Sequence, residues 1–248
     1  VQFSDKTAIV TGSGNGIGAA VAHRLAAAGA SVMLADNNEE SAHAVCAEIT
    51  AAGGRAAACK VDIRIPEEVQ AMIDYSREMF GPANILINNA GLGSQKHFLE
   101  TPLATLHQML EVNVVGTFLC SQAAAHDMIE MGGGRIVNIS SSRIWAGNPN
   151  RLHYTTSKAG VVGLTRALAR EVGDDKIGVN AITPGFTESE TQMASSSANY
   201  VAGRDLSRSF KRPQYPDDLV GAVMFLLSDA SAFITGQTIN VDGGQAMH

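Results

Sequence analysis

The stretch TAIVTGSGNGIG (residues 7–18) decides the fold class that we expect for this chain of 248 residues. It opens with a short β-branched run (residues 7–10) and continues into a glycine-rich turn (residues 12–18). A helical pattern follows, and its apolar face holds Ile17, Val21 and Leu25. Glycines let a phosphate approach the backbone, and the N-terminus of the next helix presents unpaired N–H groups. Strand, turn and helix in this order therefore indicate a dinucleotide-binding unit.

The rest of the chain repeats this alternation. Short apolar runs predict strands at residues 31–35, 55–61, 85–87, 135–139, 179–182 and 238–241. Helices are predicted over residues 39–52, 66–80, about 102–131 (continuous or broken), after Tyr154, and over 219–227. Such alternation favours a parallel sheet, and continuous apolar strands indicate helices on both of its faces. We expect one Rossmann-type, doubly wound α/β domain over residues 1–248.

Ligands of such sheets bind beyond the carboxyl ends of the strands, and the chain's notable polar residues follow those ends. We expect a cofactor half at about residues 1–135 and a catalytic and substrate-binding half at about 136–248. The polar stretch at about residues 187–217 is long for a structureless connector, which indicates a mobile substrate loop.

Composition excludes several classes of partner. The net charge is −6 and no block of basic residues occurs, so neither nucleic acid nor an anionic membrane is expected as a partner. The amino-terminal stretch lacks a signal-peptide pattern, and no apolar run reaches 18 residues. The three cysteines are widely spaced, which indicates reduced thiols in the cytoplasm. No metal ligands are expected.

Asp36 ends the second predicted strand, eighteen residues past Gly18. A carboxylate there hydrogen-bonds the adenosine ribose and repels a 2′-phosphate, and the next residues, Asn37 and Asn38, carry no compensating charge. This favours NAD over NADP, and the alternative is a solvated aspartate at the end of a strand. Asp62 ends the third strand, where it meets either the adenine edge or solvent.

A second informative stretch is SSSRIWAGNPNRLHYTTSK (residues 140–158). Tyr154 and Lys158 are four residues apart, so they share one face of a helix. An ammonium beside a tyrosine favours the phenolate, which brings the ordinary pKa of about 10 closer to neutrality. This pair alone is common by chance, but the serines and the glycine turn make the combination specific.

The chain resembles the classical short-chain dehydrogenase/reductase family along essentially its whole length. The matching residues are Thr11-Gly12-x-x-x-Gly16-x-Gly18, Asn88-Asn89-Ala90-Gly91, Asn113, Ser141, Tyr154-x-x-Ser157-Lys158, Pro184-Gly185 and Val241-Asp242-Gly243-Gly244. The glycine spacing alone also fits Gly14-x-Gly16-x-x-Ala19, and the resemblance favours the Thr-Gly form. It also selects Ser141 among the three serines, thirteen residues before the tyrosine. One departure is Ser189, where many members of the family carry threonine.

The resemblance implies roles for these residues. Tyr154 is the general acid/base, Ser141 hydrogen-bonds the substrate oxygen, and Lys158 lowers the tyrosine pKa and binds the nicotinamide ribose. Asn113 holds a water that links Lys158 to solvent, and Asn88 braces the sheet. The implied cofactor-binding residues are Gly12, Asn15, Gly16, Ile17, Gly18, Asp36, Asp62, Ile63, Asn89, Ala90, Gly91, Tyr154, Lys158, Pro184, Gly185 and Thr187.

We infer the class of substrate from the residues between Ser141 and Tyr154. Trp145 either walls an aromatic pocket or simply packs, Arg143 either meets an anionic substrate or is an exposed loop residue, and Ser142 is a further pocket candidate. Ser141-x-x-x-Trp145, His153-Tyr154, the segment 233–238 and His248 are similar to 1-arylethanol dehydrogenases and pyridoxal 4-dehydrogenases of the family. We therefore expect NAD-dependent oxidation of a secondary, aryl-substituted alcohol to a ketone.

Other functions remain open. A 3-oxoacyl-(acyl carrier protein) reductase has the same architecture but usually uses NADPH, against which Asp36 argues. A non-catalytic NAD-sensing protein would typically lack Tyr154 or Lys158, and an epimerase of the extended branch would need a longer chain. The low charged fraction (17%) and an apolar segment at residues 230–241 are typical of subunit contacts, and the family resemblance implies a homotetramer.

Overall fold

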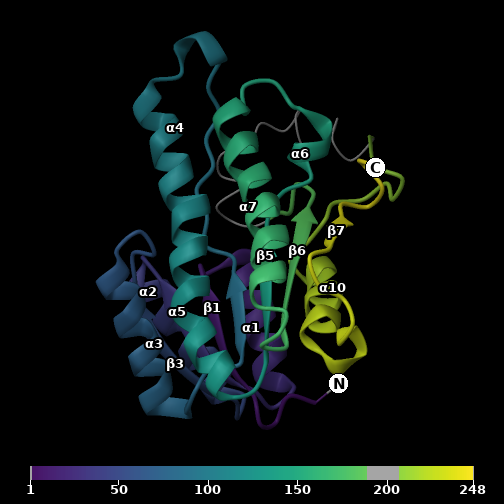
Figure 1. The fold of residues 1–248 in the computed structure, drawn as a ribbon. Coiled ribbons are helices and arrows are strands. Elements are labelled where there is room, and N and C mark those ends of the chain that lie inside the picture. Colours follow the sequence, from purple (N-terminus) through teal and green to yellow (C-terminus); the bar gives the residue numbers. More distant parts are fainter. Residues whose placement is uncertain (1, 189–206, 248) are drawn as a thin grey trace.

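A computed structural model describes residues 2–188 and 207–247 of the chain. Within these ranges seven parallel strands form a single sheet in the order β3-β2-β1-β4-β5-β6-β7 (Figure 1). The strands are β1 (Thr7–Thr11), β2 (Ser31–Asp36), β3 (Arg55–Lys60), β4 (Ile85–Asn88), β5 (Gly134–Ile139), β6 (Ile177–Pro184) and β7 (Thr238–Val241). Ser189, His248 and much of the expected substrate loop lie outside the described residues.

Helices cover both faces of this sheet. They are α1 (Gly16–Ala27), α2 (Glu39–Ala51), α3 (Pro66–Phe80), α4 (Leu103–Leu110), α5 (Gly116–Glu130), α6 (Arg143–Ala146), α7 (Leu152–Glu171) and α10 (Asp217–Leu227). Ala8 and Val10 of β1 pack with α1, α2 and α10, whereas Ile9 between them packs with α3, α5 and α7. The continuous apolar strands are thus explained, because each is buried on both faces. The predicted doubly wound α/β sheet is confirmed.

The strand order reverses between β1 and β4, which pair in parallel although β2 and β3 intervene in sequence. At such a switch point the loops that follow neighbouring strands separate, and a ligand can enter between them. The turn after β1 and the segment after β4 therefore border the site.

Two helices differ in detail from the prediction made from the sequence. The long helix at residues 102–131 is interrupted at Glu111–Val115 by one wider, π-helical turn between α4 and α5. The helix expected after Tyr154 begins earlier, at Leu152, because Asn150 turns the chain with a positive φ of 62°. Tyr154 consequently lies inside the first turn of α7. Residues 143–146 form a short helix, α6, that the sequence did not predict.

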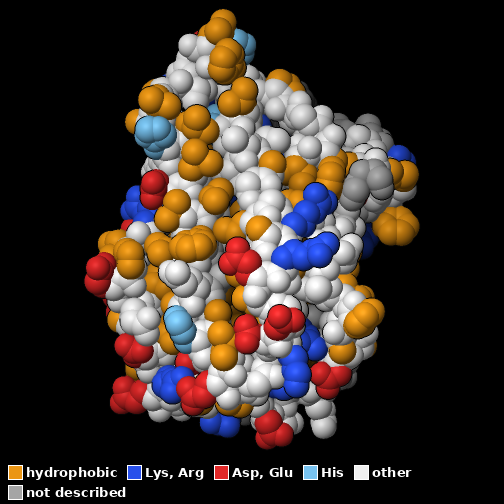
Figure 2. Space-filling view, viewed as in Figure 1, with side chains coloured by type: hydrophobic (Ala, Val, Ile, Leu, Met, Phe, Trp, Pro, Cys, Tyr) orange, Lys and Arg blue, Asp and Glu red, His pale blue; other side chains and the backbone are white. Residues whose placement is uncertain are grey.

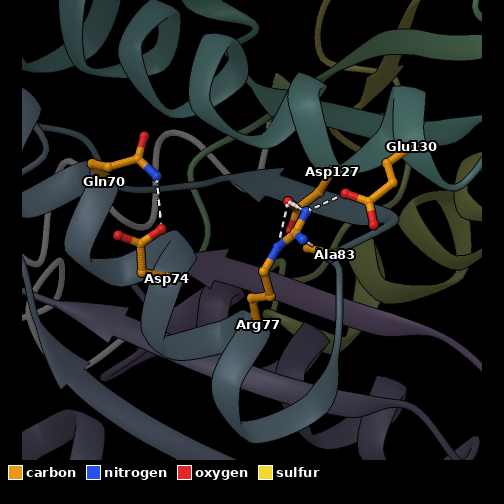
Figure 3. Close-up of polar contacts among 6 residues, drawn as sticks. All are labelled: Gln70, Asp74, Arg77, Ala83, Asp127 and Glu130. Atoms are coloured by element: carbon orange, nitrogen blue, oxygen red, sulfur yellow. Dashed lines mark hydrogen bonds and ion pairs between the residues drawn. The ribbon is translucent and has the colours of Figure 1, made fainter.

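A buried carboxylate joins α3 to α5 (Figure 3). Asp127 is 2% exposed and accepts hydrogen bonds from the backbone N–H of Ala83 at 2.8 Å and from Nη2 of Arg77 at 2.6 Å. The same guanidinium also donates to Glu130, at 2.6 Å. These bonds fix the loop that enters β4, at the edge of the sheet opposite the carboxyl ends of the strands. No helix in the described ranges is long and apolar enough to cross a bilayer.

Candidate active site

A cleft of about 970 Å³ opens at the carboxyl ends of the strands. It is lined by most of the residues that the sequence singled out: Gly12, Asn15, Gly16, Ile17, Asp36, Asp62, Ile63, Asn89, Ala90, Gly91, Ser141, Arg143, Tyr154, Lys158, Pro184, Gly185 and Thr187. Four other predicted residues, Gly18, Asn113, Ser142 and Trp145, do not belong to the lining that the described residues form. The structure thus brings the two expected halves of the site together in one cleft.

The glycine turn is held against the segment that follows β4. Gly12 has a φ of +62°, and a Cβ atom on it would lie 2.7 Å from the Cα atom of Ala90. The side-chain amide of Asn89 donates to the carbonyl oxygens of Thr11 and Gly12, at 3.1 and 2.7 Å. Only a residue without a side chain fits this close approach. The residues present therefore fit a dinucleotide, whose pyrophosphate would lie against the turn and the N-terminus of α1.

Asn88, the neighbour of Asn89, points into the sheet. Its amide nitrogen donates to Ser121 Oγ at 2.9 Å and to Asn138 Oδ1 at 2.8 Å, and all three residues are buried. The prediction that Asn88 braces the sheet is confirmed.

Asp36 and Asp62 lie at the end of the cleft where an adenosine would bind. The carboxylate of Asp36 accepts from the backbone N–H groups of Gly14, at 2.8 Å, and Asn38, at 2.9 Å. These contacts fix its orientation on the glycine turn. The adenosine ribose contact remains a prediction.

The carboxylate of Asp62 is paired with Arg64, whose Nε lies 2.9 Å from Oδ1. Hydrogen bonding to this guanidinium is the largest cause of a lowered pKa for Asp62. Sequence reasoning looked for basic residues only beside Asp36, and it missed Arg64, which also lines the cleft. The contact of Asp62 with an adenine edge remains a prediction.

The three serines after β5 point to different places. Ser140 Oγ donates to the backbone carbonyl of Lys158 at 2.7 Å, and the backbone N–H of Ser142 donates to the carbonyl of Pro184 at 2.9 Å. Ser141 alone shares a hydrogen bond with the phenol of Tyr154. The catalytic role of Ser141 that the family resemblance implies remains a prediction.

Burial raises the pKa of Tyr154 above its ordinary 10.0. The hydrogen bond with Ser141 opposes this rise, as do the positive charges of Arg151 and Arg143. Lys158 does not figure among the groups that lower this pKa. Its ammonium instead donates to the carbonyl oxygen of Ile139 at 2.9 Å, and burial lowers its own pKa to about 8. The lowering of the Tyr154 pKa by Lys158, which the family resemblance implies, remains a prediction.

Asn113 lies in the wider helical turn between α4 and α5 and is fully buried. Its amide nitrogen donates to the carbonyl oxygen of Leu92 at 2.9 Å and to Ser157 Oγ at 2.8 Å, and its Oδ1 accepts from the Leu92 N–H at 2.8 Å. Since Ser157 Oγ in turn donates to the carbonyl of Tyr154, Asn113 joins the segment after β4 to the first turns of α7. Its proposed role in a water relay remains a prediction.

Sequence reasoning missed Arg151 and Ser94, which lie near Tyr154 and the named residue His153. The guanidinium carbon of Arg151 lies 5.7 Å from the centre of the Tyr154 ring, and Arg151 lines the cleft. His153, which is fully buried, is hydrogen-bonded to Ser94 at 2.8 Å, and Ser94 also lines the cleft. Neither Arg151 nor Ser94 belongs to a motif, and the only signal in the sequence was the short distance of Arg151 from Tyr154 along the chain.

Fold and site define a Rossmann-type oxidoreductase, and comparison with known proteins narrows this class. The family profile described as "Enoyl-(Acyl carrier protein) reductase" matches residues 12–246. The chain is 36% identical to a 3-oxoacyl-[acyl-carrier-protein] reductase of Synechocystis, with 98% of this chain and 97% of that protein covered. It is also 36% identical to the 7alpha-hydroxysteroid dehydrogenase of Escherichia coli, with coverages of 98% and 95%.

A solved structure of 7α-hydroxysteroid dehydrogenase with NADH and 7-oxo glycochenodeoxycholic acid superimposes with a TM-score of 0.96. It is 35% identical in sequence, and the match covers 100% of this chain and 96% of that one. The protein therefore belongs to the classical short-chain dehydrogenase/reductase family.

Proposed function

We propose that this protein is an NAD-dependent oxidoreductase that interconverts a secondary alcohol and a ketone. The observation that carries the proposal is the hydrogen bond between Ser141 and Tyr154, in the same cleft as Lys158 and the glycine turn. These groups are the ones that a carbonyl reduction needs at the substrate oxygen.

Tyr154 is the proposed general acid for ketone reduction. Its raised pKa keeps the phenol protonated near neutral pH, so it can donate a proton to the substrate oxygen. The hydroxyl of Ser141 donates to the same oxygen and stabilises the charge that develops there. When bound, the nicotinamide supplies the hydride, or accepts it in the reverse direction. Lys158 holds the nicotinamide ribose, and Asn113 holds the water that returns protons from solvent.

NAD is the proposed cofactor because of Asp36. Its carboxylate lines the adenosine end of the cleft, where it would accept from ribose hydroxyls and repel a 2′-phosphate. We propose that the residues predicted from the sequence to bind the cofactor do so. Arg64 is added to this set because it is hydrogen-bonded to Asp62.

The proposed substrate is a secondary alcohol with an aryl substituent, such as a 1-arylethanol, and the corresponding acetophenone is its ketone. The similarity of Ser141-x-x-x-Trp145 and His153-Tyr154 to 1-arylethanol dehydrogenases supports this choice, although Trp145 in α6 is not part of the cleft lining that the described residues form. The alternative is a reductase of 3-oxoacyl groups, which the relative from Synechocystis supports by its name. A non-catalytic NAD sensor is the alternative of a different class, and the intact set Ser141, Tyr154 and Lys158 argues against it.

We further propose a cytoplasmic homotetramer. Hydrophobic side chains gather over α4 and α5 in Figure 2. The exposed hydrophobic residues of these two helices include Leu103, Phe118 and Ile129. A second copy of the chain would bury them. Cys46, Cys59 and Cys120 are free thiols, which supports a reducing compartment.

A cofactor-and-substrate screen tests the function. Acetophenone, a 3-oxoacyl thioester and a 7-oxosteroid are each offered with NADH and with NADPH, and nicotinamide absorbance is followed. With the two cofactors compared side by side, we expect the kcat/KM for reduction of acetophenone to be higher with NADH than with NADPH. Preference for the thioester with NADPH would support the alternative reductase, and binding of NADH without turnover of any ketone would support the sensor.

A further inference from the structure

Two arginines border the reacting end of the cleft. Arg143 is the first residue of α6, two positions after Ser141, and Arg151 directly precedes α7. Both line the cleft, and both charges act on the phenol of Tyr154. The guanidinium of Arg151 lies 5.7 Å from the centre of the Tyr154 ring. The positive charge is therefore close to the atoms where substrate chemistry is proposed.

The backbone around Arg151 holds it in this place. A Cβ atom on Gly93 would lie 3.4 Å from the Tyr154 ring and 3.8 Å from a guanidinium nitrogen of Arg151, so the Gly93 backbone lies against both side chains. The carbonyl oxygen of Asn150 accepts from the backbone N–H of Lys96 at 2.9 Å, which ties the loop before α7 to the segment after β4. Arg151 thus lies where these two segments meet.

Helix stability does not explain a cation at this position. Arg151 is the N-cap residue of α7, a helix of 20 residues with no acidic side chain in its first turn. The helix macrodipole makes this terminus positive, so a guanidinium there is unfavourable for the helix itself. A local preference that is broken beside a reactive residue is typical of a functional site.

Charge is distributed unevenly along the cleft. Among the described residues that line it, the carboxylates are Asp36 and Asp62, and both belong to the adenosine end. Arg64 also lines the adenosine end, but it is paired with Asp62, so that end keeps the negative charge of Asp36. The substrate end contributes Arg143 and Arg151, and no carboxylate among the described residues lines it. Guanidinium groups match the planar geometry of a carboxylate and form paired hydrogen bonds with it.

We infer that Arg143 and Arg151 recognise a carboxylate of the substrate, so that the protein prefers a hydroxy acid and its oxo acid to the matching neutral alcohol and ketone. The inference rests on the proposed function, because it names the substrate class of the same site. It is compatible with an aryl substituent, as in a ketone that bears both an aromatic ring and a carboxylate.

Matched ketones test this inference. Reduction of 4-acetylbenzoate is compared with that of its methyl ester, and reduction of 3-oxobutanoate with that of its methyl ester, each with NADH. We expect the parent protein to prefer each acid over its ester by about tenfold or more in kcat/KM, as charge-assisted hydrogen bonds allow. Arg143→Gln and Arg151→Gln should each lower this acid-to-ester ratio about tenfold, and Arg151→Lys should lower it less.

The ratio separates substrate recognition from effects on Tyr154, because any change in the phenol alters both ketones of a pair alike. Arg166→Gln, which removes an exposed guanidinium of α7 that does not line the cleft, is the matched control and should keep the parent ratio. Thermal unfolding and NADH fluorescence verify that each variant is folded and binds cofactor.

The acid-to-ester ratio tests the inference, whereas turnover of any ketone tests the proposed function. An acid-to-ester ratio near one in the parent protein would overturn the inference, and so would a ratio that neither glutamine variant changes. In both cases, turnover of the esters would still support the proposed oxidoreductase. If no ketone is reduced with either nicotinamide, the proposed function fails. Calorimetric titration of the protein with 4-acetylbenzoate in the presence of NADH then decides the inference: weaker binding in Arg143→Gln and Arg151→Gln supports it, and unchanged affinity contradicts it.

Discussion

The ammonium of Lys158 donates to the carbonyl oxygen of Ile139 at 2.9 Å, and both residues are buried. Burial lowers the pKa of Lys158 from 10.5 to about 8. Between these two pH values the unfolded chain binds more protons than the folded one, so the free energy of unfolding rises with pH. The contribution is unfavourable below pH 8 and disappears above 10.5, and a shift of this size corresponds to about 3 kcal/mol.

Lys158→Met removes this titration. We expect the stability of the parent relative to Lys158→Met to rise by on the order of 3 kcal/mol between pH 7 and 10.5. Urea unfolding at a fixed protein concentration measures the difference at each pH. A difference that stays constant over this interval would show that the folded protein does not lower the pKa of Lys158.

Arg151 is expected to set the pH dependence of alcohol oxidation. Oxidation needs the Tyr154 phenolate, whose formation burial disfavours and the charge of Arg151 favours. Loss of that charge in Arg151→Gln should therefore move the rise of kcat/KM for oxidation to higher pH. The profile is measured with NAD and a saturable secondary alcohol, with Arg166→Gln as control. A shift to lower pH would contradict the electrostatic role of Arg151.

Asp36 is expected to exclude the 2′-phosphate of NADP. Asp36→Asn keeps the size of the side chain but removes its charge, so the preference for NADH over NADPH should fall about tenfold or more, as for other losses of like-charge repulsion. The ratio of the two kcat/KM values with one ketone measures this preference. Asp174→Asn, an exposed substitution beyond α7, serves as the control. An unchanged ratio would place cofactor selection elsewhere, with Arg64 as the next residue to substitute.

The buried carboxylate of Asp127 is expected to matter for stability rather than chemistry. Asp127→Ala leaves the Ala83 N–H without its acceptor and removes the partner of Arg77, which should cost about 2–4 kcal/mol of unfolding free energy. Glu130→Ala removes only the exposed branch of the same network and should stay close to the parent. Denaturant unfolding measures both, and equal losses would show that burial of Asp127 is not the cause.

Much of the fold was predictable because its strands are buried on both faces. Residues such as Ile9 and Val10 must both be apolar when helices cover each side of β1, so the continuous runs identified the strands. The polar residues after those strands then converged at one edge by topology alone. The family resemblance, in contrast, selected Ser141 among the three serines and grouped it with Tyr154 and Lys158.

What the sequence could not predict depends on contacts between distant segments. The wider turn at Asn113 forms around its bonds to Leu92 and Ser157, which lie 21 and 44 residues away. The proximity of Arg151 to Tyr154 depends on a loop that is hydrogen-bonded to Lys96. Lys158 of α7 donates to the carbonyl oxygen of Ile139, the last residue of β5, which lies 19 residues earlier in the chain. Local propensity carries no information about such pairs.

Tyr154→Phe tests the proton transfer that we assign to the phenol of Tyr154. We expect kcat for NADH-dependent ketone reduction to fall about 10²- to 10⁴-fold, the usual contribution of a general acid, while the dissociation constant of NADH measured by fluorescence stays unchanged. Tyr215→Phe, an exposed tyrosine outside the cleft, should keep parent activity. Turnover by Tyr154→Phe at the parent rate would contradict the account.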